Sequence, residues 1–309
     1  MLKTVREVLR ERMTECARAA FDRYRRAIVP IYGADERGRP AHIGSGILLR
    51  IPEGHCLLTA AHIIDENSRT TLYTGVSRTE ELLLEFAITI SAEGDRRHDH
   101  LDFALAGLPE RVVLGLTGAT FIEESKISRS VATSVGRTYT CLGFPHSKNK
   151  TPPGQIKNLQ PMFGVYTSVG VAHQKLAPLA NERDHILVDF NSKYSRDENG
   201  NKVSTIRFQG FSGGAIVDLG RLSDPSTLDQ QCDPLLAAVI IEAHKNEKVV
   251  LGTRLTRILS AMRFSDQAAC GSCISPPICL SRASCEASRK VCIGVLPKQY
   301  RPWWVRRWL

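Results

Sequence analysis

Short apolar runs of strand length recur along most of this 309-residue chain. Between residues 27 and 108, and again between residues 136 and 254, these runs alternate with clusters of Gly, Pro, Asp, Asn and Arg. Runs of about four to eight residues separated by turn residues are typical of antiparallel barrels and sandwiches. Each of the two regions holds about six such runs. The pattern therefore predicts an all-β protein with two tandem six-stranded antiparallel barrels.

The two ends of the chain depart from this pattern. Apolar residues at roughly helical spacing over residues 2–26 predict an amphipathic N-terminal helix within a segment that spans residues 1–26. The stretch TRLTRILSAM, residues 253–262, predicts a helix that closes the second barrel. Residues 265–309 are rich in Cys, Ser, Pro and Arg without periodicity, which favours a disordered or extended basic tail.

The net charge of +9 comes from the two ends of the chain. Residues 1–29 carry eight Lys and Arg against four Asp and Glu, and residues 266–309 carry seven against two. The central residues 30–265 are therefore neutral in sum, so the charge gives no reason to expect a nucleic-acid face on the core.

The cysteines and the hydropathy of the chain indicate the cellular compartment in which the protein is expected. Of nine cysteines, five crowd residues 270–292, and the odd total argues for free thiols rather than a disulfide framework. The charged N-terminus does not match a secretory signal. No apolar run approaches the ~18 residues of a membrane span. We therefore expect a cytoplasmic protein with no transmembrane segment. The cysteines of the body are Cys16, Cys56, Cys141 and Cys232.

Two motifs stand out in the tail. CGSC at residues 270–273 could bind zinc, because two thiolates at this spacing are a common half-site. The remaining cysteines do not repeat the close pair, so we expect a thiol-bearing tail rather than a zinc site. The last nine residues, RPWWVRRWL, suit a membrane surface or an acidic groove of a partner, and a strand that docks on the body explains them equally well.

A glycine-rich loop surrounds one serine in the second region. In RFQGFSGGAIVD, residues 207–218, Ser212 stands among Gly210, Gly213 and Gly214. Glycine permits positive φ and close backbone approach, so the pattern predicts a tight loop with N–H groups turned toward a ligand. A simple hairpin turn before strand 215–218 is the alternative. A serine is a weak nucleophile, so the catalytic interpretation requires a base elsewhere in the chain.

Two polar residues in the first region can supply a base and its partner. LLTAAHIID, residues 57–65, is an apolar strand that ends in small residues and His62. HDHLDFALAGL, residues 98–108, places Asp102 between apolar residues at the start of a strand, where a carboxylate is costly unless it is hydrogen-bonded. Taken singly, His62 is also explained as an exposed histidine at a strand end, and Asp102 as an aspartate in a turn.

The order His62, Asp102, Ser212 is more specific than any of its parts. With TAAH, DFALAGL and GFSGG as its motifs, the chain resembles the trypsin-like (chymotrypsin-fold) serine peptidases over roughly residues 27–262. The resemblance implies two chymotrypsin-like barrels and a serine endopeptidase that acts on a protein or peptide substrate, with no cofactor and no metal.

The resemblance also assigns a role to each residue of the site. Ser212 is the expected nucleophile and His62 its general base, and Asp102 orients the imidazole. The backbone N–H groups of Gly210 and Ser212 form the expected oxyanion hole.

Departures from the family pattern refine these expectations. Phe211 stands where the secreted digestive members have an aspartate that pairs with a new N-terminus, and an Ile-Val-Gly-Gly start is absent. We therefore expect a disulfide-free intracellular type that needs no proteolytic activation. Ile206, six positions before Ser212, is the expected floor of the substrate pocket and would favour an apolar or small side chain, whereas neighbouring Arg207 would favour an acidic one.

Two alternatives remain open at this stage. The barrels of a pseudoprotease would bind peptides without cleaving them. A latent peptidase would stay inactive until an activating protein partner ordered its loops.

Overall fold

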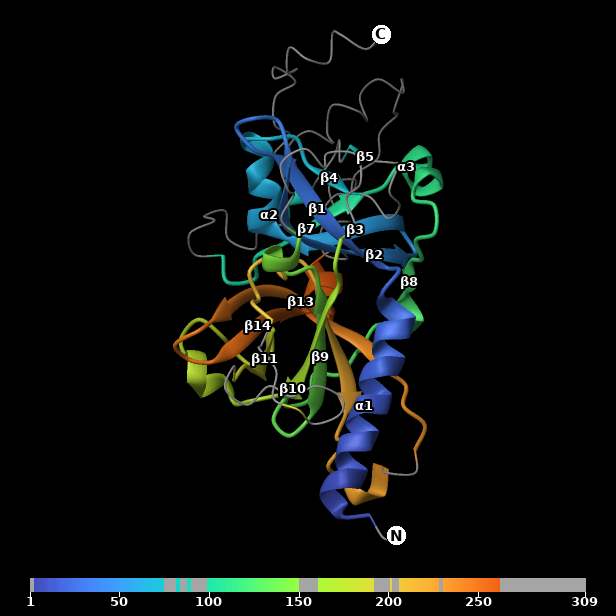
Figure 1. Cartoon of the computed structure of the whole chain (residues 1–309), viewed down its shortest axis with the longest axis vertical. Coiled ribbons are helices and arrows are strands. Elements are labelled where there is room, and N and C mark those ends of the chain that lie inside the picture. The colour runs from blue at the N-terminus through green and yellow to red at the C-terminus, as the bar shows by residue number, and fades with distance from the viewer. Residues whose placement is uncertain are drawn as a thin grey trace, which may run out of the picture. The chain divides into compact units, whose positions relative to one another are not determined.

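The computed structural model describes most of the chain up to residue 261, namely residues 3–74, 82–83, 88–89, 99–149, 161–191, 201, 206–227 and 230–261. The expected tail, residues 265–309, lies outside the described residues, and so do its CGSC and tryptophan motifs. The described part is mostly β, with antiparallel sheets, one half-barrel and helices near both ends (Figure 1).

The N-terminal helix α1 runs from Val5 to Tyr24. A capping box starts it: the Thr4 hydroxyl accepts the Glu7 N–H, and the Glu7 carboxylate accepts the Thr4 N–H. Cys16, Ala20 and Tyr24, spaced four apart, are the buried residues of one face. This is the amphipathic helix expected from the sequence.

The first sheet has eight strands rather than the expected six. Its strand order is β5-β4-β1-β2-β3-β7-β6, and β8 pairs with β2. Two features add the extra strands: the run at residues 81–90 forms two short strands, and the connector after residue 108 contributes β8 in parallel with β2. The strands are β1 (Ile28–Ala34), β2 (Pro40–Ile51), β3 (Gly54–Ala60), β4 (Tyr73–Thr74), β5 (Leu82–Leu83), β6 (Ile88–Thr89), β7 (Phe103–Gly107) and β8 (Ile122–Glu123).

The second sheet has six antiparallel strands in the order β10-β9-β12-β13-β14-β11. Its two edge strands approach each other, because Gly170, which follows β10, forms a bridge with Val188 of β11. We identify this curled sheet as the half-barrel. Its strands are β9 (Thr138–Gly143), β10 (Gly164–Val169), β11 (His185–Asp189), β12 (Ala215–Gly220), β13 (Leu235–His244) and β14 (Val249–Arg254).

Short helices join the strands and follow the last one. Residues 255–261 are helical, so the expected closing helix begins two residues later than the sequence predicted. The reason is that Thr253 and Arg254 still pair with the neighbouring strands β11 and β13. The connecting helices are α2 (Ala61–Asp65), α3 (Glu110–Gly115) and the 3-10 turns η1 (Glu66–Ser68), η3 (Glu124–Lys126), η4 (His146–Lys148), η5 (His173–Leu176) and η7 (Pro225–Thr227).

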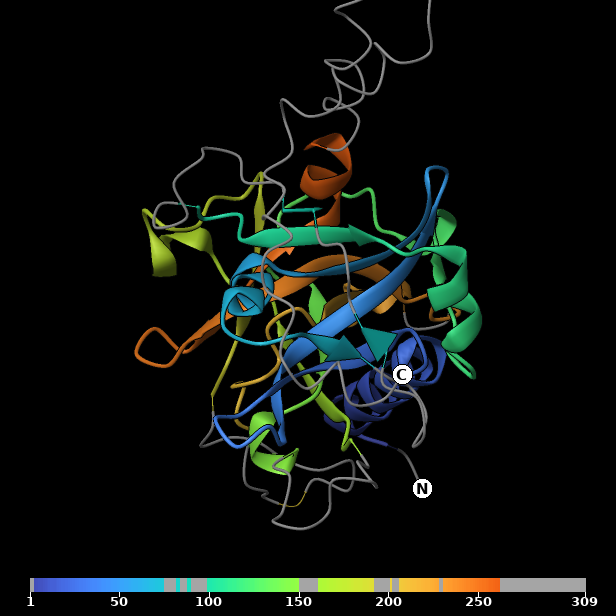
Figure 2. The ribbon, with the colours of Figure 1, turned by 90° about the horizontal axis from the view of Figure 1, so that it is seen from above.

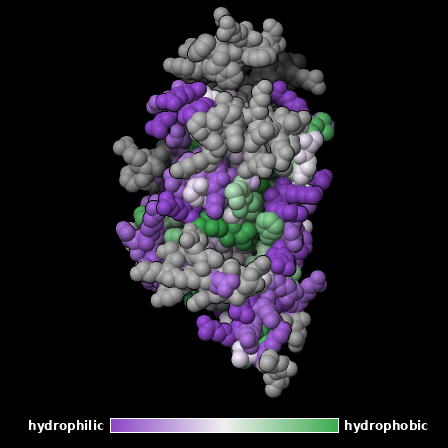
Figure 3. All heavy atoms as spheres, in the orientation of Figure 1, coloured by the Kyte–Doolittle hydropathy of each residue, from purple (hydrophilic) through white to green (hydrophobic). Residues whose placement is uncertain are grey.

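The second sheet is buried on both faces. Alternate residues of β9 and β13 belong to different apolar clusters: Leu142 and Val239 face the large core shared with α1 and the first sheet, whereas Cys141 and Ile240 face a smaller cluster. The first sheet lies above the second in Figure 1, and Figure 2 shows the same arrangement from above. Polar side chains cover much of the face in Figure 3, around an apolar area at its centre.

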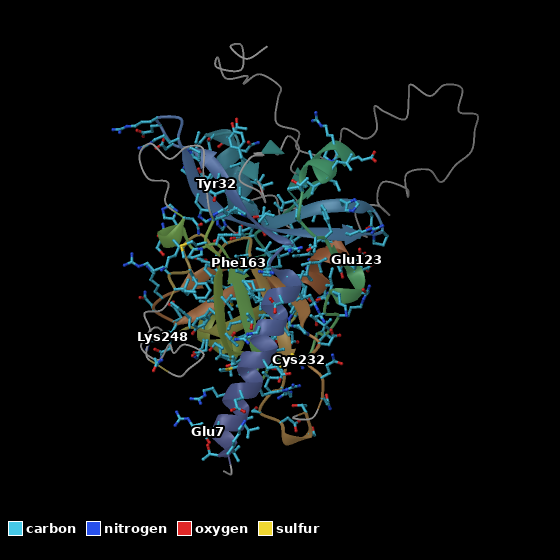
Figure 4. The ribbon with its side chains drawn as sticks, turned by 45° about the vertical axis from the view of Figure 1, so that its right-hand side comes forward. Glu7, Tyr32, Glu123, Phe163, Cys232 and Lys248 are labelled. Atoms are coloured by element: carbon cyan, nitrogen blue, oxygen red, sulfur yellow. The ribbon has the colours of Figure 1, made fainter. Side chains whose placement is uncertain are left out.

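Helix α1 is anchored to the segment that leads into β13. The Tyr24 hydroxyl donates to the Pro234 carbonyl at 2.7 Å, and the Arg23 guanidinium donates to the same oxygen at 2.8 Å. Cys232 lies beside the helix in Figure 4. Its thiol interacts with that of Cys16, which is buried on this helix. Within the described residues, no helix combines the length and the apolar character needed to span a membrane.

Candidate active site

Asp102 and His62 meet where β3 ends and α2 begins. The Asp102 carboxylate accepts the His62 backbone N–H through Oδ1 at 2.9 Å, and its Oδ2 lies 2.6 Å from Nδ1 of the His62 ring. The Asp102 carbonyl also accepts the Ala61 N–H at 2.9 Å. One aspartate therefore holds both the backbone and the imidazole of His62, and the carboxylate requires Nδ1 to carry the proton.

The backbone of Asp102 is in the left-handed region, with φ of +39°. Such a conformation costs about 1–3 kcal/mol in a residue other than glycine and persists only where neighbouring contacts enforce it. The Asp99 carboxylate supplies one such contact by accepting the Leu101 N–H at 3.1 Å. Thr253 of β14 supplies another, since its hydroxyl donates to the Leu101 carbonyl at 2.6 Å. The second sheet thus helps to hold the segment that carries Asp102.

The environment of His62 raises its pKa above the ordinary value. Burial lowers the pKa of this imidazole, but the hydrogen bond with Asp102 and the negative charge of its carboxylate outweigh that effect. Asp65 and Glu242 act in the same direction as Asp102. His62 is consequently a stronger base than a free histidine, while nearly half of its side chain stays exposed.

Ser212 lies at the same junction but is not hydrogen-bonded to His62. Its hydroxyl donates to the Ile241 carbonyl at 3.1 Å, and within the described residues no hydrogen bond joins it to the imidazole. Gly44 of β2 separates the two segments: a β-carbon at Gly44 would lie 2.6 Å from the Ile63 side chain and 3.0 Å from the Ser212 carbonyl oxygen. In the structure, His62 is therefore hydrogen-bonded to Asp102, whereas the Ser212 hydroxyl is hydrogen-bonded to a backbone carbonyl.

The Gly210 amide is turned away from the segment that follows β9. The Gln209 carbonyl accepts the His146 N–H at 2.7 Å. In a trans peptide the N–H points opposite to the C=O, so the Gly210 N–H is turned away from His146. In the described part of the chain, neither this N–H nor that of Ser212 has a hydrogen-bond acceptor. Two amides of one tight loop are thus free to bind an anionic oxygen.

The glycines of the loop are required by its geometry. Gly210 and Gly213 have φ of +92° and +81°. A β-carbon at Gly213 would lie 1.9 Å from the Ser45 carbonyl oxygen and 2.2 Å from the Thr59 hydroxyl. At Gly214 it would lie 2.4 Å from the Leu142 carbonyl oxygen. Positive φ and close backbone approach, the two reasons expected from the sequence, both apply here.

Phe211 and Ile206 lie in the smaller apolar cluster of the second sheet. The Phe211 side chain is fully buried, and its ring centroid lies 4.8 Å from that of Phe208. Ile206 is half-buried against the same cluster, and Arg207 is exposed. The position before the serine is thus occupied by a core aromatic ring.

Two histidines near Gly210 were missed in the sequence. His42 of β2 is only 4% exposed, and neither of its ring nitrogens has a hydrogen-bond partner among the described residues. Burial, together with the proximity of His146, lowers the pKa of His42 to about 4. His146 Nδ1 donates to the His42 carbonyl at 3.0 Å. Nothing in the local pattern around residue 42 signals this burial, because it depends on contacts with Tyr32 and His146.

Ser45 was also missed, although it lies at the centre of the junction. Its hydroxyl and its main chain contact the loop that carries Ser212. The only local signal is its place between two glycines, Gly44 and Gly46, in IGSGILL. No group of three or more His, Cys, Asp or Glu side chains suited to a metal ion occurs in the part of the chain that the structure describes.

Comparisons with known proteins find a likeness in structure. No family model matches the chain, and neither does any curated protein. The chain is similar to a solved structure from work on aromatic interactions that drive the coupled folding and binding of the intrinsically disordered Sesbania mosaic virus VPg protein. That likeness has a TM-score of 0.42 and 16% sequence identity, and it covers 75% of this chain and 87% of the other.

Proposed function

We propose that this chain is a serine endopeptidase of the chymotrypsin fold, with Ser212, His62 and Asp102 as its catalytic triad. The observation that carries the proposal is that the Asp102 carboxylate accepts two hydrogen bonds from His62, one from its backbone N–H and one from Nδ1 of its ring. The half-barrel and the largely antiparallel first sheet support the fold, in which each sheet corresponds to one barrel.

The chemistry follows from the groups at the junction. The Ser212 hydroxyl turns from the Ile241 carbonyl to Nε2 of His62, a side-chain rotation that takes picoseconds to nanoseconds. Its oxygen then attacks the peptide carbonyl while His62 takes the proton, and Asp102 stabilises the imidazolium. The developing oxyanion accepts hydrogen bonds from the N–H groups of Gly210 and Ser212. His62 next protonates the leaving amine, and water hydrolyses the acyl-enzyme by the same route.

The substrate is a protein or peptide. Ile206 offers no counter-charge for a Lys or Arg side chain, and burial of an unpaired cation costs several kcal/mol, so we propose an apolar or small residue before the scissile bond. Free, buried thiols at Cys16, Cys56 and Cys141 support a reducing compartment, and we propose regulated proteolysis in the cytoplasm.

A fluorophosphonate probe tests the proposal directly, because it reacts with an activated serine. We expect a single label on Ser212 after peptide mapping. Ser212→Ala and His62→Ala should both abolish labelling, since the two residues act as a unit. Ser68→Ala is the matched control: the Ser68 hydroxyl also donates to a backbone carbonyl, that of Asp65, but lies outside the site. A label on another serine, or unchanged peptide hydrolysis by Ser212→Ala, would contradict the assignment.

A peptide-binding module without catalysis is the second candidate. The hydrogen bond of Ser212 to the Ile241 carbonyl, instead of to His62, favours it. In that case the probe leaves Ser212 unlabelled, while wild type and Ser212→Ala bind the same peptides with equal affinity. A latent peptidase differs from both, because labelling appears once an activating protein partner is added.

A further inference from the structure

Ser45 occupies the middle of β2, on the first sheet, and is completely buried. Its hydroxyl donates to the Gly210 carbonyl at 2.9 Å and accepts the Phe144 N–H at 2.9 Å. Its backbone N–H donates to the Ser212 carbonyl at 2.8 Å, and its carbonyl accepts the Thr59 hydroxyl at 2.7 Å. Every polar group of this residue is therefore engaged, and two of its bonds reach the loop that carries Ser212.

These bonds complete a set of four along the loop. The consecutive carbonyls of residues 209 to 212 accept, in order, the His146 N–H, the Ser45 hydroxyl, the Gly214 N–H and the Ser45 N–H. Because each bound C=O fixes the plane of its peptide, the orientation of the following N–H is fixed as well. The free N–H of Gly210 thus belongs to the peptide held by His146, and that of Ser212 to the peptide held by Gly214. The two bonds from Ser45 hold the peptides that alternate with these, 210–211 and 212–213.

The direction of the Ser45 hydroxyl is set by its own surroundings. A hydroxyl has one hydrogen to donate, and the Phe144 N–H occupies one of its lone pairs. The hydrogen is then directed at the Gly210 carbonyl, which is buried. Without the hydroxyl, that carbonyl and the Phe144 N–H both lose a buried partner, which is unfavourable. The 210–211 peptide is then held only through its N–H, which donates from Phe211 to the Phe208 carbonyl at 2.8 Å, so its orientation is less firmly fixed.

We propose that Ser45 is a positioning residue of the oxyanion hole. Its hydroxyl and its N–H hold the carbonyls of Gly210 and Ser212, and thereby the 210–211 and 212–213 peptides. The 210–211 peptide adjoins both peptides that carry the free amides, so Ser45 restrains the amides of Gly210 and Ser212 through their neighbours and keeps them pointing at the oxyanion. This inference rests on the proposed peptidase activity. It also explains how the first sheet, which supplies the base, sets the geometry of a loop that belongs to the second sheet.

Ser45→Ala tests the proposal when its kinetics are compared with those of Thr74→Val. Thr74 is also a buried residue of the first sheet, and its hydroxyl donates to the Pro30 carbonyl at 2.8 Å, so the control removes one buried hydroxyl bond away from the site. Outright removal of an oxyanion donor lowers kcat by about 10²- to 10³-fold. For a misaligned donor we expect a smaller loss in Ser45→Ala, about 10- to 100-fold in kcat with KM nearly unchanged, and no such loss in Thr74→Val.

An inhibitor pair separates positioning from mere stability. A peptide aldehyde forms an oxyanion with the serine, whereas the corresponding product peptide does not. Ser45→Ala should weaken aldehyde affinity by a similar factor, about 10- to 100-fold, and leave product affinity unchanged, whereas a purely structural role would leave the ratio of the two affinities as in wild type. Equal kcat in wild type and Ser45→Ala would overturn the proposal.

A second variant keeps the test decisive if Ser45→Ala does not fold. Ser45→Cys keeps a weak donor, so its kcat should lie between those of wild type and Ser45→Ala. If Ser45→Ala does not fold, the expected result is a kcat of Ser45→Cys below that of wild type. A wild-type kcat in Ser45→Cys would count against the proposal. If wild type itself neither hydrolyses peptides nor reacts with the fluorophosphonate, the proposed function fails instead, so the two failures are distinguishable.

Discussion

Gly213→Ala should destabilise the protein much more than an alanine at another glycine with the same φ. Gly213 has φ of +81°, and an L-residue in this region costs about 1–2 kcal/mol. The new β-carbon would also lie 1.9 Å from the Ser45 carbonyl oxygen and 2.2 Å from the Thr59 hydroxyl. One neighbour is backbone, so β2 or the loop must shift, and overpacking of this kind costs about 1–3 kcal/mol. The expected loss is therefore about 2–5 kcal/mol in the free energy of unfolding.

Gly118→Ala isolates the steric part of this loss. Gly118 has φ of +79°, but a β-carbon there would meet nothing within 4 Å. Its expected cost is the backbone strain alone, about 1–2 kcal/mol. Urea denaturation of both variants and wild type, with equal m-values as the check on two-state unfolding, measures the difference. Equal losses for Gly213→Ala and Gly118→Ala would refute the close approach of β2 to the loop.

Four further predictions follow from the site. Because Asp102 raises the pKa of His62, the rate of serine labelling should rise with pH to a midpoint above that of a free histidine, and Asp102→Asn should move this midpoint down. His42 has a pKa of about 4 when folded. As the pH falls from ~6.5 towards 4, the unfolded chain takes up a proton on His42 before the folded chain does, so the free energy of unfolding should decrease by about 3 kcal/mol. Urea unfolding of His42→Phe should lack this part of the acid dependence. Phe211→Asp buries an unpaired carboxylate and should lower stability by several kcal/mol in thermal denaturation, so a native-like Tm would contradict the burial of this ring. Profiling on a mixed peptide library should show cleavage after apolar residues, in keeping with Ile206, whereas dominant cleavage after Lys or Arg would exclude an apolar pocket.

Local patterns in the sequence were sufficient for several parts of the fold. The spacing of apolar residues predicted helix α1, because a buried helical face needs side chains four residues apart, and Cys16, Ala20 and Tyr24 meet that need. Strand-length runs predicted a mostly β chain for the same kind of reason. The glycines around Ser212 predicted a tight loop, since Gly210 and Gly213 adopt positive φ.

Other features depend on segments that are distant in the sequence. Neither the parallel pairing of β8 with β2 nor the left-handed backbone of Asp102 has a local signature, because partners elsewhere in the fold impose both. The burial of His42 and the bonds from Ser45 to Gly210 likewise arise only when the two sheets pack together. A sequence pattern specifies which side chains can be buried, but the register and packing of distant strands decide which polar atoms come within hydrogen-bond distance.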